Sequence, residues 1–288
     1  MEVSFPGLGI DLNINRVAFS VFGFDIYWYA LIIMTGFVLA VIYAVCNAKR
    51  FDVKIDPLID VVLVGLVCGI IGARAYYVIF RWNSYDNFWD MINIRDGGLA
   101  IYGGVIAAFV SGLIMCKIRK LDVMSVFDVA GIGFLIGQGI GRWGNFMNQE
   151  AFGSMTDLPW GMYSENTCYT EIVDGVTKFV GPTTVHPCFL YESIWCLWGF
   201  VLLHFISQYY YKFRGQMFLC YLLWYGLGRA WIEGLRTDSL WLVDNVIKVS
   251  QLLAIVCVLV AAAMLFIGFK GVKIKGRTIF KPVEAGEA

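Results

Sequence analysis

Seven stretches of this chain are long and apolar enough to cross a lipid bilayer, and this pattern restricts the fold more than any other feature. They cover approximately residues 26–48, 57–80, 99–116, 124–147, 188–211, 216–235 and 249–269. A helix of about 20 residues spans the hydrocarbon core, which is about 30 Å thick. The chain is 59% hydrophobic and 15% charged, with a mean hydropathy of +0.69, which is too apolar for a soluble domain. The sequence therefore predicts an all-α, polytopic membrane protein with about seven transmembrane helices.

The basic residues outside these stretches are unevenly distributed. If the N-terminus lies outside the cell, thirteen of them fall on the cytoplasmic side and six on the outer side. The thirteen are Lys49, Arg50, Lys54, Lys117, Arg119, Lys120, Lys212, Arg214, Lys270, Lys273, Lys275, Arg277 and Lys281, and the six are Arg16, Arg81, Arg95, Lys178, Arg236 and Lys248. Because cytoplasmic loops carry the excess of Lys and Arg, we expect the N-terminus outside and the C-terminus inside.

This topology divides the chain into five segments. Residues 1–25 lack the basic start and cleavage site of a signal peptide, so we expect a retained arm on the outer membrane surface. Residues 26–148 hold the first four transmembrane helices, and residues 188–269 hold the last three. Between them, residues 149–187 are rich in Gly, Pro, Asp and Asn, and we expect a small head over the outer mouth of the bundle. Residues 270–288 form a basic cytoplasmic tail.

The run from Gly141 to Gly153 places an arginine, Arg142, at the end of a long apolar helix. An arginine at the centre of a membrane helix costs about 2.5–3.5 kcal/mol on insertion scales, so an anion or a partner side chain is expected nearby. Snorkelling of Arg142 from the helix end to the membrane surface is the alternative. Asn145 follows three residues later, and Glu150 comes just after the helix. This combination favours a site for a polar, anionic ligand.

Four polar residues of the sixth stretch, Tyr225, Arg229, Glu233 and Arg236, are spaced by four, four and three positions. Residues at these spacings share one helix face, and a polar face on an apolar helix is expected to point into the protein. The alternative is an internal salt bridge between Arg229 and Glu233 that only positions the helices.

Three further blocks contain polar or aromatic residues at the outer ends of predicted helices. His186 precedes Pro187, which suits the first turn of a helix, and Tyr191 and Glu192 follow. The second block runs from Asp96 through two glycines to Tyr102 and two more glycines. The third is the aromatic cluster around Tyr29, for which an interfacial aromatic belt is the alternative interpretation.

These blocks resemble the conserved motifs of the prolipoprotein diacylglyceryl transferases. Residues 141–153 match the pattern G-R-x-G-N-F-x-N-x-E-x-x-G at every fixed position, and residues 186–192 are similar to H-P-x-x-L-Y-E. Residues 96–104 and 228–238 are similar to two further family blocks. The resemblance implies an enzyme of the bacterial cytoplasmic membrane that transfers a diacylglyceryl group from phosphatidylglycerol to the lipobox cysteine of a prolipoprotein. A thioether forms and glycerol phosphate is released.

The resemblance, together with the charge pattern, assigns roles to individual residues. We expect Arg142 and Arg229 to bind the phosphate, and we leave the group that activates the thiol open among Tyr102, His186 and Glu150. Many family members have histidine where this chain has Tyr102, and a tyrosine starts from a pKa near 10, so we expect Tyr102 to orient substrate. The predicted substrate-binding residues are Arg142, Asn145, Gly153, Tyr29, Tyr225, Glu233 and Arg236. We expect Glu233 to hold Arg229 in place.

No metal or other cofactor is expected, because the sequence shows no ligand-like cluster of His, Cys and carboxylates. The expected partners are phosphatidylglycerol, the lipobox segment of a prolipoprotein and the bilayer, with no nucleic acid. A transporter or flippase for an anionic lipid or solute is the alternative function, although the paired repeats and broken helices of many transporters are not evident. A non-catalytic scaffold leaves the buried arginines unexplained. A disulfide between Cys168 and Cys188 is sterically conceivable.

Overall fold

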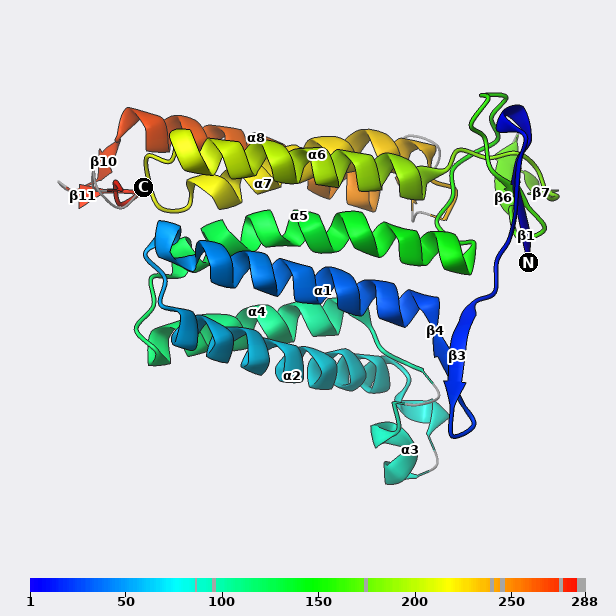
Figure 1. Cartoon of the computed structure of the whole chain (residues 1–288), viewed down its shortest axis with the longest axis horizontal. Helices are drawn as coiled ribbons and strands as arrows, with labels where there is room; N and C mark the ends of the chain where they lie inside the picture. The colour runs from blue at the N-terminus through cyan, green and yellow to red at the C-terminus, as the bar shows by residue number, and fades with distance from the viewer. Residues whose placement is uncertain are drawn as a thin grey trace.

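The computed structural model describes residues 1–85, 87–94, 97–173, 176–238, 241–243, 247–274 and 277–283. Its long helices run side by side, with α5 in the middle of the bundle (Figure 1). They are α1 (Trp28–Asn47), α2 (Ile55–Phe80), α4 (Ile101–Ile118), α5 (Val123–Asn148), α6 (Cys188–Tyr209), α7 (Gln216–Leu235) and α8 (Val249–Lys270). Each agrees with a predicted stretch to within about two residues at either end, which is the usual uncertainty of a helix boundary. The predicted helical membrane architecture is confirmed.

Among the described residues, six helices are long and apolar enough to cross a membrane, and α7 is not one of them. α7 has 20 residues, as α1 does, but it carries the charged residues Arg229 and Glu233. It packs against α5, α6 and α8, and this packing buries Ile232 and Glu233. The other helices therefore shield the polar face of α7 from lipid, which explains how a less apolar helix is accommodated.

Helix α5 forms the core of the bundle. Asp122 caps its first turn by accepting a hydrogen bond from the Ser125 backbone nitrogen at 3.1 Å. Val129, Ile132 and Leu135 have no exposed surface. On one side α1 comes close, because a Cβ atom on Gly36 would lie only 3.1 Å from a backbone oxygen of α5. The residues at the far end of α5 that the sequence predicts as site residues thus stand on the most firmly packed helix.

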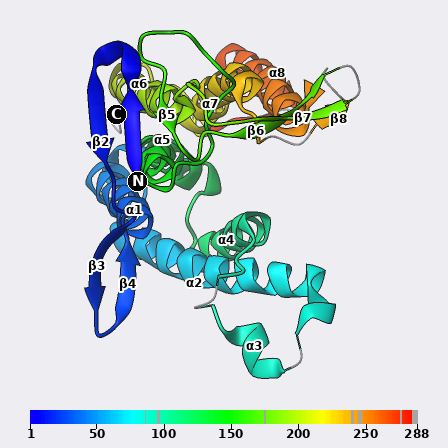
Figure 2. The ribbon, with the colours of Figure 1, turned by 90° about the vertical axis from the view of Figure 1, so that its right-hand side faces the viewer.

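Helices α2 and α4 form a pair beside this core (Figures 1 and 2). Their backbones touch, since a Cβ atom on Gly72 would lie 2.7 Å from the Gly103 carbonyl oxygen. The pair meets α5 where the rings of Phe109 and Phe127 stack at 5.5 Å.

The N-terminal segment forms two hairpins at one end of the bundle. The first consists of β1 (Glu2–Phe5) and β2 (Ile10–Asn13), and β5 (Tyr163–Ser164) pairs with β1 to give the sheet order β2-β1-β5. The second consists of β3 (Val17–Val21) and β4 (Phe24–Tyr27), which leads directly into α1. The head also holds the pair β6 (Tyr169–Val173) and β7 (Val176–Val180). Small sheets therefore accompany the helices, and the first hairpin belongs to the head.

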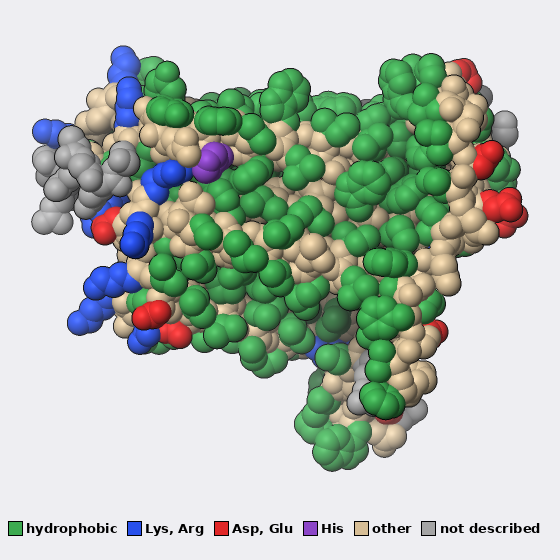
Figure 3. Space-filling model, viewed as in Figure 1, with side chains coloured by type: hydrophobic (Ala, Val, Ile, Leu, Met, Phe, Trp, Pro, Cys, Tyr) green, Lys and Arg blue, Asp and Glu red, His purple; other side chains and the backbone are tan. Residues whose placement is uncertain are grey.

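The remaining elements are short. They are η1 (Pro6–Leu8), η2 (Ala48–Phe51), η3 (Trp82–Ser84), α3 (Phe88–Ile92), β8 (Trp241–Val243), β9 (Ile247–Lys248), β10 (Lys273–Ile274) and β11 (Arg277–Thr278). At the end opposite the head, the C-terminal segment contacts the α6–α7 connection, where the Arg214 nitrogen donates to the Lys281 carbonyl at 2.9 Å. Lys and Arg side chains gather at this end (Figure 3), in the loops and tail that the sequence grouped together. Cys168 and Cys188 carry free thiols, so the conceivable disulfide is not formed.

Candidate active site

A buried carboxylate, Glu192 on α6, joins two arginines from two other helices. Arg142 of α5 lies 2.5 Å from Glu192 Oε1, and Arg229 of α7 lies 3.4 Å from Oε2. Only 3% of the Glu192 side chain is exposed, and about a fifth of each arginine. The sequence motif contained Glu192, but we assigned no role to it. The anion expected near Arg142 is therefore, in this structure, a side chain of the protein.

The polar face of α7 points toward this carboxylate. Arg229 forms a second ion pair with Glu233 at 2.8 Å, and Ser250 of α8 also donates a hydrogen bond to Glu233. The Tyr225 hydroxyl lies 3.4 Å from Glu192. The structure contains the internal salt bridge of the alternative interpretation, but Arg229 also reaches across to α6. Two guanidinium groups and two carboxylates make this cluster electrically balanced.

A chain of hydrogen bonds runs from Arg142 to the end of α5. Arg142 Nη1 donates to Asn145 Oδ1 at 3.3 Å, and Asn145 Nδ2 donates to Glu150 Oε1 at 2.8 Å. Gln149 has a left-handed backbone conformation, with φ of 56°, which ends the helix and turns the chain back. This turn brings Glu150 beside Asn145, so the three residues predicted from one motif are joined by hydrogen bonds.

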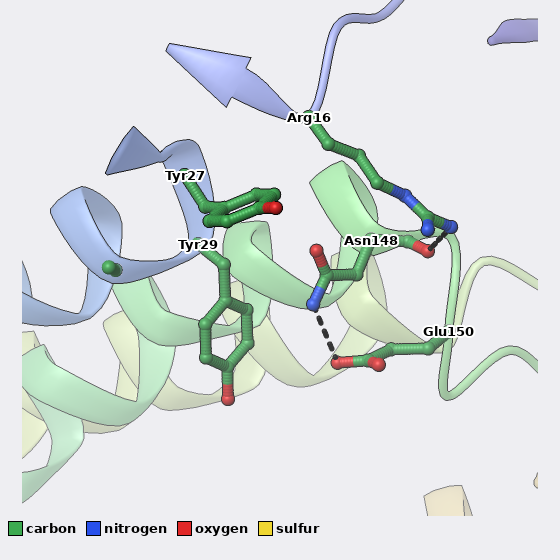
Figure 4. Close-up of a pocket in the computed structure, with 6 residues that line it drawn as sticks. Arg16, Tyr27, Tyr29, Asn148 and Glu150 are labelled. Carbon is green, nitrogen blue, oxygen red and sulfur yellow. Dashed lines mark hydrogen bonds between the residues drawn. The ribbon is translucent and has the colours of Figure 1, made fainter. Parts of the chain in front are cut away.

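A pocket of about 400 Å³ opens next to Glu150 (Figure 4). It is lined by Arg16, Tyr27, Tyr29, Ala30, Asn148 and Glu150. Arg16 closes one side by donating to the Asn148 carbonyl oxygen at 2.7 Å. Tyr29 also contacts the helix behind it, since a Cβ atom on Gly144 would lie 2.9 Å from its ring. The sequence predicted Tyr29 and Glu150 as site residues but not Arg16. In the sequence, Arg16 is only one basic residue of the N-terminal arm.

His186 and Gly153 belong to a neighbouring part of the outer end. The Gly153 nitrogen donates to the His186 carbonyl at 2.9 Å, and a Cβ atom on Gly153 would lie 2.7 Å from the His186 Cβ. His186 Nδ1 is 3.2 Å from the Tyr191 hydroxyl, and burial lowers the pKa of His186. The ring is therefore neutral at pH 7 and is hydrogen-bonded to Tyr191, away from the arginine cluster.

Arg236 and Lys248 close the end of α7. Arg236 forms two hydrogen bonds to the Asp238 carboxylate, at 3.0 and 2.8 Å. The buried Lys248 donates to the carbonyl oxygens of Glu233 (2.8 Å), Gly234 (3.4 Å) and Arg236, and burial lowers its pKa. Carbonyl groups at a helix C-terminus attract a cation. Lys248 thus holds the segment that carries Arg236, a role that its position before the last span did not reveal.

The structure leaves Tyr102 apart from these groups. It lies at the start of α4 and is 73% exposed, and its side chain forms no hydrogen bond with another described residue. Asp96 of the same block lies outside the described residues. The two glycines between them are held by Arg74, which donates to the carbonyl oxygens of Gly97 (2.8 Å) and Gly98 (3.0 Å). Arg74, to which the sequence analysis assigned no role, is the positioning residue of this block.

These observations define an α-helical membrane protein with a buried arginine–carboxylate cluster and a polar pocket at one end. The profile of the family described as prolipoprotein diacylglyceryl transferase matches residues 16–267. The chain belongs to this family.

Three relatives are named as phosphatidylglycerol–prolipoprotein diacylglyceryl transferases. The phosphatidylglycerol–prolipoprotein diacylglyceryl transferase of Finegoldia magna is 42% identical over 257 residues, which cover 89% of this chain and 96% of the relative. Transferase 1 of Clostridium perfringens is 39% identical over 92% of this chain and 99% of the relative. The enzyme of Bacillus licheniformis is 40% identical over 91% of this chain and 96% of the relative. The similarity therefore extends over nearly the whole length of both partners.

Proposed function

We propose that this chain transfers the diacylglyceryl group of phosphatidylglycerol to the lipobox cysteine of a prolipoprotein, and that the transfer occurs at the Arg142–Arg229 cluster. The transferase activity follows from family membership and from the names of the relatives. The observation that supports the location is the convergence of two half-buried arginines on the single buried carboxylate of Glu192. Family membership favours this function over transport.

The reaction displaces a phosphate group from a glyceryl carbon, so negative charge grows on the departing phosphate. Guanidinium groups bind phosphate through paired hydrogen bonds and stabilise that charge in a site with little water. In the present arrangement both arginines are already paired with carboxylates. We propose that at least one guanidinium exchanges Glu192 for a phosphate oxygen when the phosphate binds. The Glu192 carboxylate stays in the cluster, so a bound phosphate adds one negative charge to two guanidinium groups and two carboxylates.

The pocket beside Glu150 suits the glycerol part of the headgroup. Its volume of about 400 Å³ is within the range of small-molecule sites. The carboxylate of Glu150 accepts hydrogen bonds from hydroxyl groups, and Arg16 and Asn148 contribute further polar atoms. Asn145 links this pocket to Arg142, and Tyr29 of α1 lines another side.

The attacking cysteine must lose its proton, because the thiolate is the nucleophile. Glu150 and His186 remain the candidates for this step. The neutral ring of His186 has the protonation state that a base needs at pH 7. Tyr102 is assigned an orienting role, because its exposed hydroxyl has no cation bound to it among the described residues.

The proposed orientation places this end of the bundle at the outer face of the bacterial cytoplasmic membrane, with the C-terminus inside. The gathering of Lys and Arg at the other end supports it (Figure 3). A reporter that is active only in the cytoplasm should be active when fused after Ala288. The same reporter inserted within residues 156–176 should be silent, and the opposite pattern would contradict this orientation.

The catalytic assignment is tested with labelled phosphatidylglycerol and a lipobox peptide. We expect Arg142→Ala and Arg229→Ala to abolish thioether formation, whereas Arg119→Ala, which breaks an exposed ion pair at the other end, should not. Lysine should restore little activity, because it lacks the planar pair of donors. Near-normal transfer by the double variant with lysine at both positions 142 and 229 would disprove the paired hydrogen bonds.

A further inference from the structure

At the end of the bundle opposite the active-site pocket, polar side chains join the ends of α1 and α6. Arg50 lies in η2, directly after α1, and its Nη1 atom donates to Ser207 Oγ of α6 at 3.2 Å. Tyr43 of α1 and His204 of α6 are joined between the tyrosine hydroxyl and Nδ1 at 3.0 Å. None of these residues contacts the Arg142–Arg229 cluster or belongs to a sequence block considered above.

The hydrogen bonds of His204 make its ring neutral. Its Nε2 atom lies 2.9 Å from the side-chain nitrogen of Gln208, and an amide nitrogen can only donate. His204 Nε2 therefore accepts, and the ring hydrogen sits on Nδ1, where it is donated to Tyr43. A doubly protonated ring has no acceptor for Gln208. The cation of this cluster is thus Arg50 alone.

Arg50 has more hydrogen-bonding capacity than its protein partners use. A guanidinium group carries five N–H donors. Within the described part of the chain, Ser207 is the only side-chain partner of Arg50, and no carboxylate lies within ion-pair distance. Arg119 and Arg214, at the same end of the bundle, each pair with an aspartate, at 2.5 and 2.8 Å. Arg50 therefore differs from its neighbours in lacking an anion.

The cluster lies at the end of a candidate membrane span, where lipid headgroups are expected. Arg50 falls in the last turn of the apolar span Trp28–Phe51. Arg50, His204 and Gln208 are all half-buried, so they are accessible from the side of the bundle. Figure 3 shows basic side chains and a histidine on this face, close to the basic end. Basic pockets between transmembrane helices at such an end bind anionic headgroups.

We propose that Arg50, supported by Ser207, His204 and Tyr43, forms a binding site for a phosphate group, and that the headgroup of an anionic phospholipid occupies it. The planar guanidinium group binds two phosphate oxygens at once, and Ser207 fixes its position. Since α1 and α6 both contribute, an occupied site links the two helices that flank α5. The site is independent of the proposed catalytic function.

The test measures binding of phosphatidic acid, whose headgroup is a bare phosphate, to the full chain by native mass spectrometry. The variants are Arg50→Gln, which keeps a donor for Ser207, and the matched control Lys49→Gln, which removes the adjacent exposed cation. Diffuse attraction to one basic residue is about 1 kcal/mol, or about fivefold in affinity. We expect at least about tenfold weaker binding of one lipid for Arg50→Gln and at most about fivefold for Lys49→Gln. Equal weakening in both would overturn the site.

Two further arms complete the test. Inorganic phosphate, added without lipid, should raise the thermal unfolding midpoint of the wild type less than phosphatidic acid does. If phosphate alone gives the full effect, and Arg50→Gln abolishes it, the site binds free phosphate and the lipid assignment is wrong. If Arg50→Gln does not fold, Arg50→Lys is compared with Lys49→Arg, because both retain the charge. Only Arg50→Lys, which loses the planar group, should then weaken binding, and unchanged binding would overturn the proposal.

Discussion

The substitution Glu192→Gln tests how much the shared carboxylate contributes to stability. The Arg142–Glu192 pair and the exposed Arg119–Asp60 pair both have N···O distances of 2.5 Å, but their burial differs. The exposed fractions of the side chains are 19% and 3% in the first pair, and 42% and 35% in the second. Because the two distances are equal, a difference in stability between the two variants reports burial together with the second arginine that Glu192 holds.

Removal of one partner from a buried ion pair leaves an uncompensated charge and costs about 3–5 kcal/mol, whereas an exposed pair contributes about 0.2–1 kcal/mol. We expect Glu192→Gln to lower the free energy of unfolding by about 3 kcal/mol, because Arg142 then loses its carboxylate partner while Arg229 keeps Glu233. Asp60→Asn should lower it by less than about 1 kcal/mol. Chemical denaturation in detergent micelles, followed by tryptophan fluorescence, measures both values.

The same variant also tests the proposed exchange of anions. If phosphate takes the place of the carboxylate, phosphatidylglycerol should recover part of the lost stability in Glu192→Gln, and its KM for the lipid should fall. Asp60→Asn should show neither effect, because it lies at the other end of the bundle. Equal losses of stability in both variants, with no effect of the lipid on either, would refute this reasoning.

Three other variants probe the surroundings of the site. Gly153→Ala should lower the free energy of unfolding by about 1–3 kcal/mol, because its Cβ atom would lie 2.7 Å from the His186 Cβ, whereas Gly181→Ala, with no atom within 4 Å, should be neutral in the same denaturation assay. Tyr102→Phe should keep at least about a tenth of the transfer activity, since loss of a general base typically reduces the rate by about 10²–10⁴-fold. Burial lowers the pKa of His186 from 6.5, so the unfolded chain takes up this proton first as the pH falls, and stability should decrease below that pH. His186→Asn should reduce this decrease, and an unchanged pH profile of unfolding would contradict the burial of a neutral ring.

The helices were predictable because an apolar stretch of about 20 residues has few other stable arrangements in a bilayer. The spacing of Arg229 and Glu233 likewise placed them on one face of α7 and permitted their ion pair. Contacts within one helix follow from its fixed periodicity, and contacts between a helix end and the next few residues are limited by the short length of chain between them. The link from Asn145 to Glu150 belongs to this second kind.

Contacts between helices were not predictable in the same way. The pairing of Arg142 with Glu192 depends on how α5 and α6 are rotated against each other, and periodicity does not determine that rotation. Arg16 reaches the pocket across 132 residues of sequence, through a hairpin whose strands are too short to show a clear alternation. Tyr102 shows the limit of motif matching, because a family position fixes the residue but not its contacts in this chain.

The order of strands in the head sheet has a consequence for how the chain is made. The central strand, β1, comes from residues 2–5, and its two neighbours are β2 and β5. Synthesis proceeds toward the C-terminus, so β1 and β2 exist as a two-stranded hairpin while α1 to α5 are still being produced. A hairpin of this size is marginally stable, and its open edge can pair with other chains. The head is therefore completed only after residues 163–164 have followed five helices into place, and until then the nascent chain presents an unpaired strand edge to its surroundings.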